Sequence, residues 1–434
     1  MVDTHTRTQT GPELARRAGV NPLDYLRSRG FIQDVTDEDG LREAFASGPV
    51  TVYVGFDPTA TSLHVGNLVG IMALANLQRL GHRPIALAGG GTVMVGDPSG
   101  KTDARQLLTV ETIEQNLVGI RKQLAHHYDF EGGRYGDNPP ALLINNADWL
   151  LGLELIPFLR DIGKHFSVNE MLATDTYRTR LETTGLNFIE FNYRVLQAYD
   201  FLHLFEDEAC RVQAGGTDQW ANIVAGVDLI RRQAGGKAFA FVWPLITTSS
   251  GQKMGKSESG AIWLDPEQLS PFDFFQFWIN TTDDDVARFM RLFTFLPDER
   301  VDDLTSVTGS ALREAKAVLA WEATALTHGA DAASEAAAAS RALFSRDASM
   351  DAVMDSDAAV DVTLTEGMTF AELFTQAGLV SSRNEARRLA EQGGMTIDDE
   401  RVPDANAAFA PNGETAVLRA GRKRVRLVRF TSNP

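Results

Sequence analysis

The chain has 434 residues, of which 44% are hydrophobic, and its formal net charge is −17. This length suggests two to four domains with a sizeable core, and the strong acidity argues against a general nucleic-acid coat. The single cysteine, Cys210, excludes an internal disulfide and a cysteine-rich zinc site, which is typical of a reducing, cytoplasmic setting.

The N-terminal residues 1–21 contain no apolar run. They predict a disordered leader that runs into a helix, and they do not have the pattern of a signal peptide. No apolar segment anywhere in the sequence is long enough to predict a membrane-spanning helix.

A β-α-β unit is predicted next. The run TVYVGF (51–56) is rich in β-branched and aromatic residues and ends at Asp57, which predicts a buried strand. Residues 67–82 have apolar positions at helical spacing, and residues 83–91 predict a second strand that enters a glycine-rich loop. We therefore expect an α/β fold with a doubly wound, Rossmann-like parallel sheet, whose ligands bind at the carboxyl ends of the strands. Further strands are predicted at 141–146, 210–216 and 238–246.

Beyond residue 248 the sequence predicts helices, and strands stop until the tail. The helical stretches are 271–280, 283–296 and the Ala-rich 311–344. Polar residues 345–361 predict a linker, and 369–402 predict a helix, a turn, a second helix and a short strand pair. The predicted division is a leader (1–21), an α/β domain (22–247), an α-helical domain (248–345), a linker (346–361) and a small α+β tail domain (362–434).

The tail domain has a different charge balance from the rest. It contains ten Lys/Arg and nine Asp/Glu, and most of the basic residues lie in RAGRKRVRLVR (419–429). A basic run is usually a solvated face. Here the cations alternate with Val and Leu, which indicates a strand that presents them to an anion such as RNA.

Two motifs suggest phosphate chemistry. His64 and Asn67 lie three residues apart at a predicted helix start, where a polar side chain is more often a cap, although free N–H groups and the helix dipole also attract phosphates there. Gly66 and Gly70 leave room for a ligand or a neighbouring element. The motif KMGKS (253–257) places two lysines on a polar loop, which is either solvated surface or a clamp that closes over a triphosphate.

Together these motifs resemble the HIGH and KMSKS signatures of class I aminoacyl-tRNA synthetases. The segments GFDPTATSLHVGN, GDPSGKTDAR, FNYRVLQAYDF, QAGGTDQWANI and KMGKSESGAIWLD follow the order and spacing of bacterial tyrosyl-tRNA synthetases. The resemblance runs from about residue 22 to the end. The tail from 362 resembles a small RNA-binding module named after a ribosomal small-subunit protein.

The resemblance implies a two-step reaction. L-Tyrosine and ATP give tyrosyl-adenylate and pyrophosphate, and the tyrosyl group then moves to the 3′ end of its tRNA. Residues 22–247 would be the catalytic domain, 248–345 an anticodon-side domain and 362–434 an RNA-binding domain. The resemblance also implies a homodimer, no membrane association, no permanent cofactor, and Mg²⁺ that arrives with the ATP. The eight histidines, the adjacent His126 and His127 included, have no metal-ligand spacing.

The resemblance also assigns roles to individual residues. Those that handle the phosphates and are treated as catalytic are His64, Asn67, Lys101, Arg105, Lys253 and Lys256. Those around the tyrosine are Tyr53, Asp57, Asp97, Tyr193, Gln197, Asp200 and Gln219. Those around ATP and the adenylate are, besides His64, Asn67 and the two loop lysines, Gly55, Thr59, Gly215, Gly216 and Asp218. Those that contact tRNA are Arg383, Arg387, Arg388, Arg422, Lys423 and Arg424.

A polar face on an otherwise apolar helix supports the tyrosine pocket independently. Tyr193, Gln197 and Asp200 are at i, i+4 and i+7 and so share one face of that helix. Asp200 either caps a segment or faces water, or it accepts the phenolic hydrogen of the substrate while Tyr53 donates to the phenolic oxygen. In the second case phenylalanine would leave both groups unpaired, at about 1–3 kcal/mol each.

Three positions depart from the family pattern. Asn67 replaces the second histidine of HIGH, Gly255 replaces the serine of KMSKS, and Thr102 follows Lys101 directly. Two other interpretations stay open: a class I enzyme for a different aromatic acid, and a non-catalytic RNA-binding protein on the same scaffold. The intact phosphate-handling positions argue against the latter.

Overall fold

The structure is a computed structural model that describes residues 19–98, 108–249, 251, 254–257, 260–344, 351–354, 356–421 and 423–432. The chain forms two compact units. The first combines Met1–Met254 with Ala287–Ser306, and the second combines Gly255–Val286 with Val307–Pro434. The predicted five-part division stays a prediction, and residues 1–18 of the leader lie outside the described part.

The first unit is built on a six-stranded sheet with the order β1-β6-β5-β2-β3-β4. The strands β2 to β6 are parallel, and the short β1 pairs antiparallel with β6 at one edge. Chain order reverses between β2 and β5, so their carboxyl ends form the switch point at which doubly wound sheets bind ligands. The predicted fold class and its strands are confirmed. The strands are β1 (Asp34–Val35), β2 (Thr51–Phe56), β3 (Arg83–Ala88), β4 (Leu142–Asn145), β5 (Cys210–Gly216) and β6 (Phe239–Trp243).

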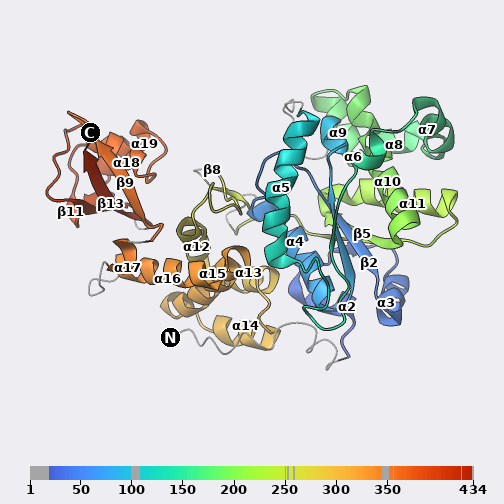
Figure 1. Cartoon of the computed structure of the whole chain (residues 1–434), viewed down its shortest axis with the longest axis horizontal. Helices are drawn as coiled ribbons and strands as arrows, with labels where there is room; N and C mark the ends of the chain where they lie inside the picture. The colour runs from blue at the N-terminus through green and yellow to red at the C-terminus, as the bar shows by residue number, and fades with distance from the viewer. Residues whose placement is uncertain are drawn as a thin grey trace. The chain divides into compact units, whose positions relative to one another are not determined.

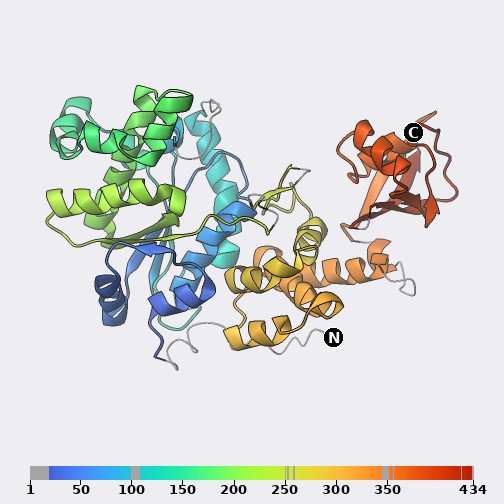
Figure 2. The ribbon, with the colours of Figure 1, turned by 180° about the vertical axis from the view of Figure 1, so that it is seen from behind.

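Helices cover both faces of this sheet (Figures 1 and 2). Helices α4 (Val65–Arg79) and α5 (Val110–His127) lie on one face, and α10 (Phe188–Glu208) and α11 (Trp220–Gln233) lie on the other. Because both faces are covered, the central strands are buried on both sides, which explains their continuous apolar sequence. The remaining helices are α2 (Pro22–Arg29), α3 (Glu38–Ser47), α6 (Ala147–Leu150), α7 (Leu155–Asp161), α8 (Val168–Leu172) and α9 (Asp175–Thr183).

The segment Ala287–Ser306 joins the first unit through a buried arginine. It contains most of α13 (Val286–Phe293) and all of α14 (Asp298–Thr305). Arg29, at the end of α2, is 1% exposed and donates hydrogen bonds to the carbonyl oxygens of Leu296 (2.6 Å), Thr294 (2.6 Å) and Met290 (3.3 Å). It also pairs with the Asp298 carboxylate at 3.0 Å. The guanidinium therefore satisfies backbone acceptors in the last turn of α13 and in the segment that follows it.

The second unit contains a helical part and a small sheet. The larger helices are α12 (Pro271–Ile279), α15 (Arg313–His328) and α16 (Ala330–Phe344), and a short α17 (Asp351–Met354) follows. The tail has a five-stranded sheet with the order β11-β10-β12-β13-β9 and two helices beside it (Figure 1). Its elements are β9 (Ala359–Leu364), α18 (Phe370–Gln376), α19 (Arg383–Glu391), β10 (Met395–Ile397), β11 (Glu400–Arg401), β12 (Thr415–Ala420) and β13 (Arg424–Ser432).

Three details differ from the sequence prediction. The prediction of no strand between 248 and the tail is wrong, because β7 (Lys256–Ser257) pairs with β8 (Gly260–Ala261), and two-residue strands are too short to produce a pattern. The first residues of the Ala-rich stretch belong to a 3-10 turn (Gly309–Leu312), and the predicted helical structure follows as α15 and α16, separated at Gly329, whose φ is +93°. Strand β9 begins at Ala359, inside the stretch predicted as a linker. No helix among the described residues is long and apolar enough to cross a membrane.

Candidate active site

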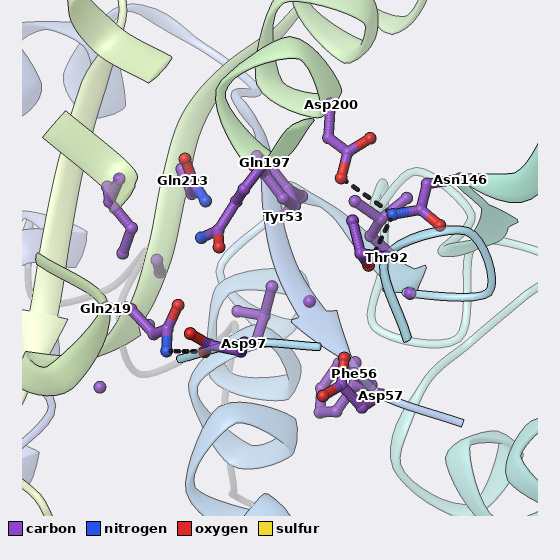
Figure 3. A pocket seen from close by; sticks show the side chains of 18 of the residues that line it. Tyr53, Phe56, Asp57, Thr92, Asp97, Asn146, Gln197, Asp200, Gln213 and Gln219 are labelled. Atoms are coloured by element: carbon purple, nitrogen blue, oxygen red, sulfur yellow. Dashed lines mark hydrogen bonds between the residues drawn. The ribbon is translucent and has the colours of Figure 1, made fainter. Parts of the chain in front are cut away.

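A cavity of about 280 Å³ opens at the carboxyl ends of β2 and β5 (Figure 3). Strands β2 and β5, the start of α4 and one face of α10 all contribute to its wall. This is the switch point of the sheet, as expected for a ligand site. The predicted site residues that line it are Tyr53, Gly55, Asp57, Asn67, Asp97, Tyr193, Gln197, Asp200, Gly215, Gly216, Asp218 and Gln219.

Asp200 is a buried carboxylate at one end of the cavity. It is 2% exposed, and its two oxygens accept hydrogen bonds from Asn146 Nδ2 at 2.9 Å and Trp149 Nε1 at 2.8 Å. Burial raises the pKa of the Asp200 carboxyl to about 7, although these two hydrogen bonds act to lower it. The alternative that Asp200 faces water is therefore wrong.

Tyr53, on β2, lines the same end of the cavity as Asp200. Its side chain is 1% exposed, and its phenolic oxygen has no hydrogen-bond partner among the described residues. Burial, and next the charge on Asp200, raise the pKa of the Tyr53 phenol well above its usual value. This end of the cavity thus offers one hydroxyl donor and one carboxylate acceptor that a bound hydroxyl group can satisfy.

Two residues that support Asp200 are absent from the sequence prediction. Asn146 donates to both Asp200 and Thr92 Oγ1 (3.0 Å) and accepts from the Gly91 N–H (2.7 Å), so its amide is fully used. Trp149 follows on α6. A polar residue directly after β4, at the ligand edge of the sheet, is the signal that could have identified Asn146.

The opposite end of the cavity carries a chain of amides that ends in a carboxylate. Gln219 donates to Asp97 Oδ2 at 2.7 Å and accepts from Asn222 at 3.2 Å, while Arg194 donates to Asn222 at 3.3 Å. Gln197 has a buried Oε1 without a partner among the described residues. Figure 3 shows Gln197 between this group and the Asp200 group. The unpartnered Gln197 Oε1 is an acceptor that suits an ammonium group.

At the start of α4, His64 and Asn67 cap the helix, and Asn67 also lines the cavity. His64 is the N-cap and accepts from the Gly66 N–H through Nδ1 at 3.0 Å, while its own N–H donates to Asn67 Oδ1 at 3.1 Å. This reciprocal capping fixes the Asn67 amide so that its Nδ2 is the group left for other partners. Asn67 lines the cavity, whereas His64 and the exposed Thr59 do not.

Gly66 brings the two signature motifs together. A methyl group on Gly66 would lie 2.7 Å from the His64 ring and 3.3 Å from the Met254 carbonyl oxygen. Met254 belongs to KMGKS, and its N–H donates to the Ile246 carbonyl at 2.9 Å. A side chain at position 66 would therefore clash chiefly with the His64 cap and would also press on the KMGKS backbone.

Several predicted cations lie outside the described residues. Lys101, Arg105, Lys253 and Arg422 are among these, and for Lys256 only the backbone of β7 is described. Their predicted roles stay predictions.

The predicted RNA-contacting residues of the tail differ in their surroundings. Arg383 pairs with Glu372 at 2.6 Å, and Arg424 pairs with Glu385 at 2.8 Å. Arg387, Arg388 and Lys423 are exposed. Ionic partners within the tail therefore already occupy some of these cations.

Comparison with known families identifies the chain. The family described as tRNA synthetases class I (W and Y) matches residues 46–345. The chain belongs to this family.

Among the described residues, no group of three His, Cys, Asp or Glu side chains could hold a metal ion.

Individual relatives narrow this result. The chain is 52% identical over 426 residues to the tyrosine–tRNA ligase of Desulfosudis oleivorans, which covers 93% of this chain and 97% of the relative. It is 48% identical over 412 residues to that of Cereibacter sphaeroides, covering 94% and 98%. A C-terminally truncated mitochondrial tyrosyl-tRNA synthetase of Aspergillus nidulans matches with a TM-score of 0.68 at 32% identity, covering 77% of this chain and 97% of that one. The predicted resemblance to bacterial tyrosyl-tRNA synthetases is confirmed.

The raised pKa of Asp200 predicts a pH-dependent affinity for tyrosine. An ionised carboxylate accepts the phenolic hydrogen of tyrosine more strongly than a neutral carboxyl does, and a carboxyl with a pKa of about 7 loses the ionised form as the pH falls. We expect the KM for tyrosine to rise about tenfold between pH 8 and pH 6. Pyrophosphate exchange at saturating ATP measures the KM for tyrosine at each pH, and the KM for ATP is the control. A KM for tyrosine that is constant over this range contradicts the proposed proton donor–acceptor pair.

The reciprocal cap of α4 permits a test that separates capping from ligand binding. Asn67→Asp keeps an oxygen to accept from the His64 N–H, and a negative charge suits a helix start, so we expect an unchanged or higher Tm. The variant loses the Nδ2 donor and brings a negative charge to the phosphates. Adenylate formation should therefore fall by at least about tenfold, as burst kinetics would measure.

The same change at the start of α2, Asn21→Asp, is the matched control, because Asn21 also caps a helix through its side-chain oxygen. It should leave the burst unchanged. A normal burst in Asn67→Asp would make Asn67 a cap only.

Proposed function

We propose that the chain is a tyrosine–tRNA ligase that activates L-tyrosine with ATP and transfers the tyrosyl group to the 3′ end of its tRNA. The observation that carries this proposal is the buried pair of Tyr53 and Asp200 in the wall of the cavity. One offers a hydroxyl donor and the other a carboxylate acceptor, which a phenolic hydroxyl can satisfy together. Phenylalanine and tryptophan lack this hydroxyl.

The chemistry of the first step needs no general base. A tyrosine carboxylate oxygen, already ionised at neutral pH, forms a bond to the α-phosphorus of ATP, and the bond from that phosphorus to the pyrophosphate oxygen breaks. Catalysis then consists of alignment and stabilisation of charge on the phosphates. Asp97, Gln197 and Tyr193 would hold the ammonium group, and Gln219 would lie beside the reacting carboxylate. Asn67 and the N–H groups of α4 would bind the phosphates.

The remaining roles follow from the same assignment. Gly55, Gly215 and Gly216 leave space for the adenylate along β2 and β5, and Asp218 would bind the ribose. Lys101, Arg105, Lys253 and Lys256 would stabilise the leaving pyrophosphate together with Mg²⁺ that arrives with ATP. A cytoplasmic location accords with these substrates.

The tail is proposed to bind tRNA through its cations. Arg387 and Arg388 lie on α19 and are exposed, and neither has an acidic partner among the described residues. Arg383 and Arg424 would have to give up Glu372 and Glu385 to bind a phosphate, so they would contribute less. The exposed Lys423, directly before β13, would add to these contacts, and Arg422, which lies outside the described residues, is proposed to contribute as well.

A homodimer is proposed on the evidence of one apolar region. Of the fourteen large hydrophobic side chains exposed in the described part of the chain, eight lie between residues 151 and 189. Contiguous exposed apolar surface is rare on monomers and marks interfaces. In Figure 1 the helices α7, α8 and α9 of this region lie at one end of the first unit. The eight side chains are Leu151, Leu155, Ile156, Leu159, Val168, Leu181, Phe188 and Ile189.

The decisive experiment for the function is amino-acid-dependent exchange of labelled pyrophosphate into ATP, run with each of the twenty amino acids. Exchange should be far faster with tyrosine than with phenylalanine, because phenylalanine leaves Tyr53 and Asp200 unpaired at about 1–3 kcal/mol each. A preference for tryptophan would favour the other branch of the family. Absence of exchange with every amino acid would favour a non-catalytic RNA-binding role.

The role of the tail predicts a selective loss of tRNA charging. Arg387→Ala combined with Arg388→Ala should weaken tRNA binding and reduce its dependence on salt by about two phosphate contacts, with tyrosine-dependent exchange unchanged. Filter binding at several salt concentrations measures this. Arg27→Ala with Arg42→Ala removes the same charge from the first unit and should leave tRNA binding unchanged. If the tRNA affinity of wild type and of the tail variant depends equally on salt concentration, Arg387 and Arg388 do not contact tRNA phosphates.

The apolar region predicts a specific disruption of the dimer. Phe188 is 80% exposed in the single chain and starts α10, where an acidic residue does not harm the helix. Phe188→Glu should therefore yield folded monomers in sedimentation-velocity experiments. Val118→Glu replaces another exposed apolar residue, 59% exposed on α5, and should stay dimeric. If the Phe188→Glu protein sediments like wild type, this apolar surface is not the dimer interface.

A further inference from the structure

Trp243 is a buried indole in the cavity wall to which neither the motifs nor the proposed chemistry gives a role. It is the last residue of β6, is 7% exposed and lines the cavity. Its register partner on the neighbouring strand is Gly216, at the end of β5. Its side chain thus stands at the same ligand edge of the sheet as Asp218.

The indole fits between two glycines. A methyl group on Gly70 of α4 would lie 3.4 Å from Trp243 Cζ2 and 3.5 Å from Cη2. A methyl group on Gly216 would lie 3.7 Å from Trp243 Nε1. The Cζ2 edge therefore faces the helix, and the adjoining N–H lies beside the Gly216 backbone, which lines the cavity.

The indole N–H is the one polar group of a side chain that is 7% exposed and lines the cavity. Tryptophan N–H groups in such places usually find a hydrogen-bond partner. The same methyl position on Gly216 lies 2.6 Å from Asp218 Oδ1, so the indole donor and the carboxylate acceptor face one small region next to Gly216. A donor beside an acceptor complements neighbouring hydroxyl groups, because each hydroxyl can both accept and donate.

We propose that Trp243 Nε1 donates a hydrogen bond to a ribose hydroxyl of ATP while Asp218 accepts from the ribose, which makes Trp243 a specificity-determining residue for the ribonucleotide. This inference rests on the proposed function in one respect, the assignment of Asp218 to the ribose. Tyrosine recognition at the other end of the cavity does not depend on it.

The test compares ATP with 2′-deoxy-ATP and 3′-deoxy-ATP by isothermal titration with the full chain. Trp243→Phe keeps an aromatic ring but has no donor. It should weaken ATP binding by about three- to tenfold, the usual range for one hydrogen bond. It should leave binding of one deoxy analogue within about twofold of wild type, because that analogue already lacks the acceptor.

A purely structural role for the indole gives a different result. In that case Trp243→Phe weakens ATP and both analogues by the same factor, and this outcome, like unchanged ATP binding, overturns the proposal. Trp243→His restores a ring N–H and should recover part of the discrimination between ATP and the deoxy analogue. If Trp243→Phe has a much lower Tm than wild type, Trp243→His is compared with Trp243→Leu instead. A loss of ATP affinity in Trp243→Leu that spares one deoxy analogue supports the proposal, and an equal loss for ATP and both analogues overturns it.

Trp321→Phe is the matched control, because it removes an indole N–H that donates to Ser334 at 3.3 Å outside the cavity. It should leave all three affinities unchanged. Tyrosine-dependent exchange is measured in parallel. Wild type that binds ATP with the predicted discrimination but catalyses no exchange would contradict the proposed function and leave this inference standing.

Discussion

A carboxylate buried at the ligand edge of a sheet must be held by donors, and the Asp200 end of the cavity is organised around this requirement. An unpaired charge at the position of Asp200 would cost several kcal/mol, so the two donors from Asn146 and Trp149 are a condition for the site. Asn146 also binds Thr92 and the Gly91 N–H, which fixes the loop after β3. One carboxylate thereby connects the loop after β3, the end of β4, α6 and α10.

The start of α4 leaves different atoms of one side chain for a structural role and for the proposed binding role. The side-chain oxygen of Asn67 accepts a hydrogen bond from the His64 N–H, and this contact fixes the direction of the amide nitrogen. His64 likewise spends Nδ1 on Gly66, so a neutral ring carries its proton on Nε2. Whether a polar residue at a helix start is a cap or a ligand is therefore a question about each atom. The sequence pattern alone left the two readings open because it does not distinguish atoms.

The parts of the structure that local pattern determines were predictable from the sequence. Strand β5 has the predicted bounds because the segment ends in two glycines, and Tyr193, Gln197 and Asp200 share a wall because of helical spacing. Asn146 and Trp149 were not found, since their contact with Asp200 spans more than fifty residues and depends on which strands are neighbours. The pairing of Arg424 with Glu385 was missed because it also joins distant elements, the two positions being 39 residues apart. From the sequence, Trp243 was predicted only as part of a strand. Its proposed role depends on Gly70 and Gly216, which come from distant elements.

Arg29 has a consequence for how far the two units are separable as modules. The chain leaves the first unit after Met254, returns at Ala287 and leaves again after Ser306, so three covalent crossings connect the units. A chain cut at the first crossing would lose Met290, Thr294, Leu296 and Asp298, and with them the hydrogen-bond partners of a guanidinium that is 1% exposed. Recombination between relatives that exchanges one unit as a single block would meet the same obstacle. In evolutionary terms the helical segment after α12 is inherited with the N-terminal helix, and the two are expected to vary together.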